Sequence, residues 1–376
     1  MDKAHSDDRE TVQAEGTDKS AQLRKMLEAH RGERHVVVLQ DYPDPDAIAA
    51  GFAHQLMSES FGIEVDVLYD GKISHQENIA LVRLLKIEAH RFSEGHDLSG
   101  YDGAVFVDNQ GTTAQRLVKA VQDSTVPILA VIDHHEQQDH LHPEFFDLRF
   151  VGATVSLYAE YMRQGLLKLD SGNERHVALA TAMMHGIITD TGGFVQAGHE
   201  DFMAASFLSR FRDSETLAQI MNQSRSKRVM ELIYYALGNR VTVENMSIAG
   251  IGYLRADDRD AIPQAADFLI SEENVHTAMV YGIVTGKNWD ESLIGSMRTS
   301  KLTLDPDEFI KDVFGQDVSG KYFGGGKLSA GGFQIPIGFL AGSGSEEFKD
   351  LKWKTFDEQV KQKIFAKLGL EENDQS

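Results

Sequence analysis

The stretch VPILAVIDHH (126–135) joins an apolar run to one aspartate and two adjacent histidines. A continuous apolar run of this length, bounded by polar residues, is typical of a strand that is buried on both faces. Asp133, His134 and His135 then stand at the carboxyl end of that strand. Ligands of parallel sheets bind at this end, so the stretch indicates both a buried strand and a binding site.

Strands and helices alternate around this stretch. Strands are expected at 35–40, 64–71, 103–110 and 126–135, and helices at 20–32, 46–62, 77–86 and 112–121. Continuous apolar strands in a βαβα order predict an α/β fold, with a parallel sheet covered by helices on both faces.

The pattern changes twice further along the chain. It becomes mostly helical after residue 150, and from 241 it predicts a smaller, second α/β domain with its own strands. The expected organisation is a disordered polar tail over 1–19, a catalytic domain over 20–225, a linker helix over 226–241 and the second domain over 242–376.

Composition limits the class of protein. The 376 residues contain 41% hydrophobic and 25% charged residues and no cysteine, so disulfides and thiolate metal sites are excluded. No signal peptide and no membrane-spanning run is recognisable, and the cytoplasm is the expected location. The formal charge of −21 argues against binding of long nucleic acid, whereas a small anionic substrate in a local pocket is compatible with it.

Acidic and imidazole side chains follow several of the predicted strands. Asp44 and Asp46 follow the first strand, Asp108 follows the third, and Asp190 ends an apolar helix. Carboxylates and imidazoles that converge at one sheet edge with His134 need a cation among them, because otherwise they repel or desolvate one another. Their mixed oxygen and nitrogen shell suits Mn²⁺, and several carboxylates together suggest two metal ions.

Each of these residues taken alone also has a structural explanation. Asp46 could be the N-cap of its helix, Asp44 a turn residue between prolines, and Asp108 a turn former at a strand end. The paired histidines behind an aspartate are much less typical of a purely structural position. The joint pattern therefore favours the metal site.

Four motifs in a fixed order carry a family resemblance. PDPDA (43–47), FVDN (106–109), IDHH (132–135) and ITDTGGF (188–194) resemble the DHH phosphoesterase family. GSMRTS (295–300) and GGGKLSAGG resemble the DHH-associated substrate-binding domain, so that the likeness spans about 35–340. This pairing is typical of nanoRNases, oligoribonucleases and cyclic-dinucleotide phosphodiesterases.

The resemblance implies roles for the residues at the sheet edge. It implies that two Mn²⁺ ions, with Mg²⁺ as the alternative, are held by Asp44, Asp46, Asp108, His134 and Asp190. Asp108, His134 and His135 would also serve catalysis, and His135 would contact the substrate or a ligand. The family commonly has a histidine where this chain has Gln40, whose amide oxygen is a weaker ligand.

The second domain is expected to hold the substrate. Gly324, Gly325 and Gly326 would present backbone N–H groups to an anion, and Arg298 would hold a phosphate with two hydrogen bonds. Lys327 stands where the family usually has a histidine and can still attract a phosphate as a point charge.

The predicted activity is hydrolysis of short ribonucleotides, most of all linear 5′-phosphorylated dinucleotides, to mononucleotides. Cyclic dinucleotides and nucleoside 3′,5′-bisphosphates are the alternative substrates. A nucleotide-binding sensor with a weakened metal site is the alternative outside the enzymes, and Gln40 is the feature that favours it. A nucleotide substrate is the expected partner, without membrane or long nucleic acid, and a homodimer is compatible with the sequence.

Overall fold

A computed structural model describes residues 19–73, 75–93, 95–138, 141–286, 290–327, 329–342 and 345–370. The chain divides into two compact units, Met1–Ser224 and Arg225–Ser376. The polar tail expected over 1–19 lies outside the described residues except for Lys19, which is part of a helix over 19–29. None of the described helices is both long and apolar enough to cross a bilayer.

The first unit is built on a parallel sheet, as the sequence predicted. Within the described residues its strand order is β3-β2-β1-β4-β5-β6, and every neighbouring pair is parallel. The strands are β1 (Arg34–Val38), β2 (Glu64–Tyr69), β3 (His90–Arg91), β4 (Gly103–Val107), β5 (Ile128–Asp133) and β6 (Phe145–Leu148). The two edge strands, β3 and β6, were not predicted, because both are short and carry no long apolar run.

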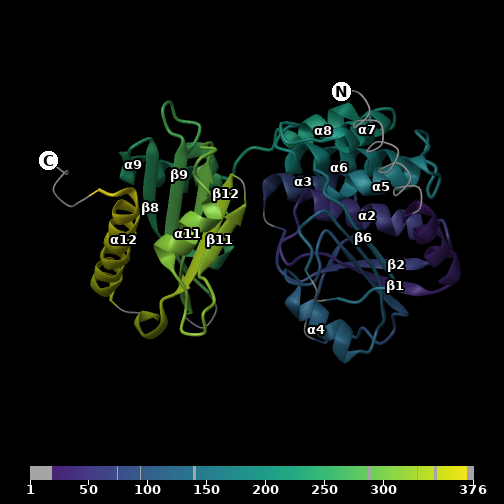
Figure 1. Ribbon diagram of the computed structural model, residues 1–376, viewed down its shortest axis with the longest axis horizontal. Helices are drawn as coiled ribbons and strands as arrows, with labels where there is room; N and C mark the ends of the chain where they lie inside the picture. The colour runs from purple at the N-terminus through teal and green to yellow at the C-terminus, as the bar shows by residue number, and fades with distance from the viewer. Residues whose placement is uncertain are drawn as a thin grey trace, which may run out of the picture. The chain divides into compact units, whose positions relative to one another are not determined.

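Helices cover both faces of this sheet (Figure 1). Alternate strand side chains point to opposite faces, so Val37 and Val105 join one apolar core while Val36 and Phe106 join another. The first core contains α2, α5 and α6, and the second contains α4. The helices of the unit include α2 (Pro45–Glu59), α3 (Gln76–Leu84), α4 (Gln115–Asp123), α5 (Thr154–Arg163), α6 (Glu174–Asp190), α7 (His199–Leu208) and α8 (Ser214–Met221).

The second unit has a mixed sheet in the order β11-β12-β10-β9-β8-β7, in which β8 and β9 are parallel and the other described pairs antiparallel. Its strands are β7 (Val241–Val243), β8 (Met246–Arg255), β9 (Thr277–Thr285), β10 (Glu291–Thr299), β11 (Gly324–Lys327) and β12 (Ala330–Pro336). The glycine-rich segment therefore forms two paired strands.

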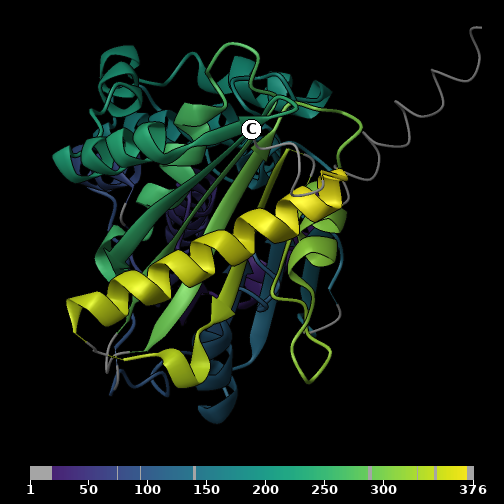
Figure 2. The same cartoon turned by 90° about the vertical axis from the view of Figure 1, so that its left-hand side faces the viewer.

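Two pairs of helices flank the second sheet. They are α9 (Lys227–Asn239) and α10 (Ala261–Leu269) on one core, and α11 (Pro306–Phe314) and α12 (Glu346–Leu368) on the other. Figure 2 shows the long helix α12 running obliquely across the strands. The helix expected to be a linker is α9, and it packs in this unit through Val229, Leu232 and Ile233.

Candidate metal centre

The carboxyl ends of β4 and β5 bring Asp108 beside the paired histidines. Asp108 directly follows β4 with φ of 54°, in the left-handed region that aspartate tolerates better than most residues. Its backbone N–H donates to the Ile132 carbonyl on β5 at 2.9 Å. This turn ends β4 and places the buried Asp108 carboxylate against the end of the neighbouring strand.

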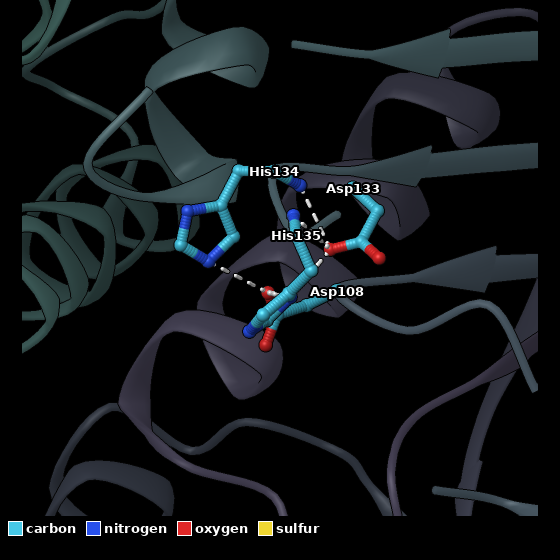
Figure 3. Close-up of side chains that lie close together, drawn as sticks. All are labelled: Asp108, Asp133, His134 and His135. Atoms are coloured by element: carbon cyan, nitrogen blue, oxygen red, sulfur yellow. Dashed lines mark hydrogen bonds and ion pairs between the residues drawn. The ribbon is translucent and has the colours of Figure 1, made fainter. Parts of the chain in front are cut away.

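His134 lies between two carboxylates. Its Nε2 atom is 3.5 Å from Asp108 Oδ1 (Figure 3) and 3.3 Å from Asp190 Oδ2. Its Nδ1 atom is 2.9 Å from the Val151 carbonyl oxygen, which can only accept, so Nδ1 carries a proton and donates it. Nε2 is thereby the nitrogen left for a metal ion, as in histidine ligands whose second nitrogen bonds a carbonyl.

Asp46 completes this group from the first turn of α2. One of its oxygens lies within 4.8 Å of both a ring nitrogen of His134 and a carboxylate oxygen of Asp190. Its two oxygens also accept the backbone N–H groups of Thr154, at 2.6 Å, and Val155, at 3.0 Å, where α5 begins. These bonds fix the Asp46 carboxylate against the amino terminus of a helix, where negative charge is stabilised.

The glycines of the ITDTGGF motif explain why Asp190 is the last residue of α6. Gly192 and Gly193 have φ of 58° and 71°, values that a glycine adopts without strain. The chain turns there, and the Phe194 N–H donates to the hydroxyl oxygen of Thr191. The helix therefore ends with a carboxylate directed at the site.

Asp133 holds His135 in place (Figure 3). Its Oδ1 atom is 2.8 Å from His135 Nδ1 and accepts the backbone N–H groups of both histidines, while Oδ2 accepts from Gln110 Nε2 at 2.7 Å. Burial raises the pKa of Asp133, but the hydrogen bonds from His135 and Gln110 outweigh it and the pKa is lowered below 3.8. His135 Nδ1 also lies 3.8 Å from Asp108 Oδ1, so Asp108, Asp133 and both histidines form a second group that could hold an ion.

Asp44 caps helix α2 and also accepts a hydrogen bond from Gln40. Its Oδ1 atom accepts the Ala47 N–H as the N-cap of α2, and its Oδ2 atom accepts Gln40 Nε2 at 3.0 Å. The cap that the sequence suggested for Asp46 therefore belongs to Asp44. Gln40 faces the carboxylate with its NH₂ group, and its amide would have to turn before Oε1 could bind a metal ion.

The charges of the centre favour a cation. Burial, followed by repulsion from neighbouring carboxylates, raises the pKa of Asp44 to about 6 and the pKa values of Asp46 and Asp108 well above their usual 3.8. The acidic neighbours also raise the pKa of His134 to about 9, although its burial acts in the opposite direction. Divalent cations would replace these protons and restore charge balance.

Orphaned polar atoms support the same conclusion. Among the described residues, Asp108 Oδ2 and His134 Nε2 are buried and have no hydrogen-bond partner. An unpaired buried polar atom costs roughly 1–3 kcal/mol, so a ligand is expected at such a position. The donor set, carboxylate oxygens with imidazole nitrogens, fits Mn²⁺ or Mg²⁺.

Two supporting residues were missed by sequence reasoning. The Thr154 hydroxyl donates to Asp108 Oδ1 at 2.9 Å. The buried Asp201 accepts from Ser156 Oγ at 2.6 Å and from the N–H groups of Gly152 and Gly198, at 3.0 and 2.8 Å for its Oδ2 atom. Asp201 thus fixes the segment 151–155, which in turn bonds His134, Asp46 and Asp108. Each is a single polar residue in a pattern typical of a helix, so the sequence carried no signal for its role.

The expected substrate residues lie in the second unit and have protein partners there. Arg298 Nε donates to Asp267 Oδ1 at 2.6 Å, and Nη1 donates to Ser296 Oγ at 2.9 Å. Gly324, Gly325 and Gly326 pair with β12, and the Gly326 N–H donates to Asp307 Oδ1 at 3.0 Å. Lys327 is exposed at the end of β11. An anion that binds here would have to displace Asp267 from Arg298 and Asp307 from Gly326.

Comparisons with known proteins agree with this architecture. Residues 35–187 match the model of the DHH family, N-terminal domain. The uncharacterized protein MJ1633 of Methanocaldococcus jannaschii is 33% identical over 368 residues, which are 97% of this chain and 70% of that protein.

A solved structure shares the fold of the chain. It is an exopolyphosphatase-related protein from Bacteroides fragilis, with a TM-score of 0.65 at 18% identity, covering 92% of this chain and 98% of that one. The residues that match the family model, 35–187, include the IDHH segment and the strand ends at Asp44, Asp46 and Asp108. This chain is therefore a member of the DHH family.

Proposed function

We propose that this protein is a metal-dependent phosphoesterase that hydrolyses short ribonucleotides, with linear 5′-phosphorylated dinucleotides as the preferred substrates. The observation that carries the proposal is the position of His134 Nε2, which is buried, has no hydrogen-bond partner among the described residues, and lies 3.3–3.5 Å from two carboxylates. Ligand atoms at right angles around an ion with bonds of about 2.1 Å are about 3 Å apart, so these separations suit a shared cation.

The proposed ligands are those that the family resemblance implied. Asp46, Asp108, His134 and Asp190 would hold the ions, with Asp44 as a further ligand and Gln40 as a weak one. When bound, two divalent cations would supply an activated water and neutralise charge on the phosphoryl group. The chain itself contributes orientation, because Asp133 fixes His135 and the segment 151–155 fixes His134 and Asp46.

The net charge of the chain favours a short oligonucleotide substrate. The formal charge of −21 makes each further phosphate of a long strand unfavourable unless a basic groove compensates for it. The proposed phosphate contacts, Arg298 and Lys327 with the Gly324–Gly326 backbone, are few and local. They suit one or two phosphates, and we expect turnover to fall as the oligonucleotide lengthens.

A substrate panel tests the proposal. The full chain is incubated with Mn²⁺ and, separately, a 5′-phosphorylated dinucleotide, a cyclic dinucleotide, a nucleoside 3′,5′-bisphosphate, a longer RNA and tripolyphosphate. Tripolyphosphate is included because the solved structure of the same fold is named exopolyphosphatase-related. Chromatography should show mononucleotides from the linear dinucleotide first.

Other outcomes have defined meanings. Faster cleavage of the longer RNA would contradict the length preference, and phosphate release from tripolyphosphate alone would move the substrate outside the nucleotides. Binding of a dinucleotide without any product would support the sensor that Gln40 favours, because its amide faces Asp44 in place of an imidazole.

A further inference from the structure

A second cluster of ligand-type side chains lies at the start of β1, in HRGERH (30–35). Glu33 Oε2 is 2.7 Å from His30 Nδ1 and 3.0 Å from His35 Nε2. One ligand atom of each residue lies within 4.8 Å of the other two. Two imidazole nitrogens and a carboxylate oxygen therefore already face one point.

A tight turn creates this arrangement. His30 follows the helix over 19–29, and the Glu33 N–H donates back to the His30 carbonyl at 3.3 Å. Gly32 takes φ of 82°, which a glycine adopts without strain, and its N–H donates to the Gly62 carbonyl at 3.1 Å. The chain thus reverses within a few residues and brings His30 back over β1.

The cluster is separate from the DHH centre, the metal centre formed by Asp46, Asp108, His134 and Asp190. His35 pairs with Gly103 in the sheet, and Asp108 lies five residues further along the chain from Gly103. At about 3.3 Å of rise per strand residue, the two places are about 16 Å apart. The cluster lies at the amino ends of the parallel strands, which form the amino edge of the sheet, and the metal centre lies at their carboxyl ends, which form the carboxyl edge.

The second nitrogen of His30 is also oriented. His30 Nε2 is 3.4 Å from Glu144 Oε2, so Glu144 can accept its proton and leave Nδ1 directed at Glu33 and His35. Metal-bound histidines commonly donate their other N–H to a carboxylate in this way. His35, the ligand from β1, is fully buried.

We propose that His30, Glu33 and His35 form a second metal site that takes Zn²⁺, with Glu144 as the outer partner of His30. Two imidazoles and one carboxylate are a nitrogen-rich set that suits Zn²⁺ better than Mg²⁺ or Ca²⁺. The Glu33 side chain is 33% exposed, so water can supply the fourth ligand. Ligand atoms around a tetrahedral ion with bonds of about 2.05 Å are about 3.3 Å apart, so Glu33 Oε2 would have to move away from the two imidazole nitrogens by about 0.3–0.6 Å.

Such an ion would join the helix over 19–29 to the sheet. That helix contributes Leu23 and Leu27 to the main core, and its end at His30 would be bound to β1 through the metal. Zn²⁺ would then stabilise the folded chain by binding it in preference to the unfolded chain. Without metal, Glu33 accepts hydrogen bonds from both imidazoles, which is the competing explanation of the geometry.

Zinc stoichiometry distinguishes the two explanations. The full chain is stripped with a chelator and dialysed against buffered Zn²⁺, and bound zinc is measured by mass spectrometry together with the melting temperature. The variants are His30→Gln and Glu33→Gln, with His276→Gln, an exposed histidine of the second unit, as the matched control. Asp108→Asn reports zinc bound at the DHH centre, and circular dichroism checks the fold of every variant.

We expect His30→Gln and Glu33→Gln each to lose one zinc per chain relative to the parent, or to bind it at least about tenfold more weakly. His276→Gln should match the parent, and Asp108→Asn should keep the zinc that depends on His30. Zn²⁺ should also raise the melting temperature of the parent more than that of either variant. Equal stoichiometry and affinity in the parent and both cluster variants would overturn the proposal and leave a hydrogen-bonded cluster.

Discussion

Histidines and carboxylates cluster at both ends of the strands of the parallel sheet. The carboxyl ends are rich in carboxylates, whereas the amino ends are rich in imidazoles. At the carboxyl edge, five carboxylates gather around two imidazoles: Asp44, Asp46, Asp108, Asp133 and Asp190 lie around His134 and His135. At the amino edge, the two imidazoles of His30 and His35 share the single carboxylate of Glu33. The same residue types therefore create very different electrostatic conditions within one sheet.

The difference shows what each edge requires. The carboxyl edge has more buried negative charge than its two imidazoles can balance, so the pKa values of Asp46 and Asp108 rise and a cation is needed. At the amino edge, Glu33 already accepts hydrogen bonds from both imidazoles, so a cation there adds stability without being required. Loss of a ligand should abolish activity at the first edge and change only metal content and stability at the second.

The largest effect is expected from Asp108→Asn. It removes a carboxylate that lies near both histidines, and the loss should exceed the 10–100-fold that outer-shell changes typically cause. Turnover of the 5′-phosphorylated dinucleotide at saturating Mn²⁺ is the measurement, with Asp123→Asn, an exposed aspartate at the end of α4, as the matched control. Near-normal turnover by a folded Asp108→Asn variant would show that activity does not depend on this carboxylate. It would contradict the expected difference between the two edges.

The next effect is expected from Asp201→Asn. Asp201 touches none of the proposed ligands but holds Gly152 and Ser156, so the change should loosen the segment that orients His134 and Asp46. We expect turnover to fall about 10–100-fold and the Mn²⁺ concentration for half-maximal activity to rise. Asp213→Ala, which removes the N-cap of α8, is the control for a purely structural loss. Equal Mn²⁺ dependence in Asp201→Asn and the parent would argue against a positioning role.

A smaller effect is expected at Gln40. Gln40→His replaces a weak amide ligand beside Asp44 with an imidazole, and the Mn²⁺ concentration for half-maximal activity should fall by about tenfold. Activity measured across a Mn²⁺ series checks this. If the variant and the parent show the same Mn²⁺ dependence, position 40 does not contact the metal.

The smallest effect concerns the pH dependence of the metal-free protein. The folded-state pKa of Asp44 is about 6 against 3.8 when unperturbed, so the folded chain binds more protons between these values. Stability that Asp44 contributes below pH 4 is therefore lost as the pH rises through about 6. The loss should be on the order of 1–3 kcal/mol, since one pKa unit corresponds to about 1.4 kcal/mol.

Urea unfolding of chelator-treated protein at several pH values measures this loss. Asp44→Asn should show a correspondingly shallower decline of the free energy of unfolding, and Mn²⁺ should remove the decline in the parent. A parent and variant with the same pH dependence would show that Asp44 carries no raised pKa.

Sequence reasoning predicted the parts of the molecule that depend on pattern. The long apolar runs of β1, β4 and β5 mark buried parallel strands, and the ends of such strands must meet at one edge. The positions of Asp108 and His134 followed from that geometry. The short edge strands β3 and β6 carry no such run, so pairing with a neighbour, which is a tertiary contact, is what makes them strands.

The remaining features depend on contacts that no pattern reveals. Asp44, rather than Asp46, caps α2 because of the local backbone angles, and both residues look alike in PDPDA. Arg298 has its partner Asp267 thirty-one positions away in the sequence, so it appeared to be available for a phosphate. The cluster of His30, Glu33 and His35 depends on a turn at Gly32, whose conformation the residue types alone do not specify.

The position of bound Mn²⁺ tests most directly whether the carboxyl ends of the parallel strands hold a two-metal centre. Crystals of the full chain grown with Mn²⁺ are measured near the manganese absorption edge, and an anomalous difference map locates the ions. A two-metal centre should give two peaks about 3.5–4 Å apart among Asp46, Asp108, His134 and Asp190. No peak at that edge of the sheet in Mn²⁺-saturated crystals would contradict it.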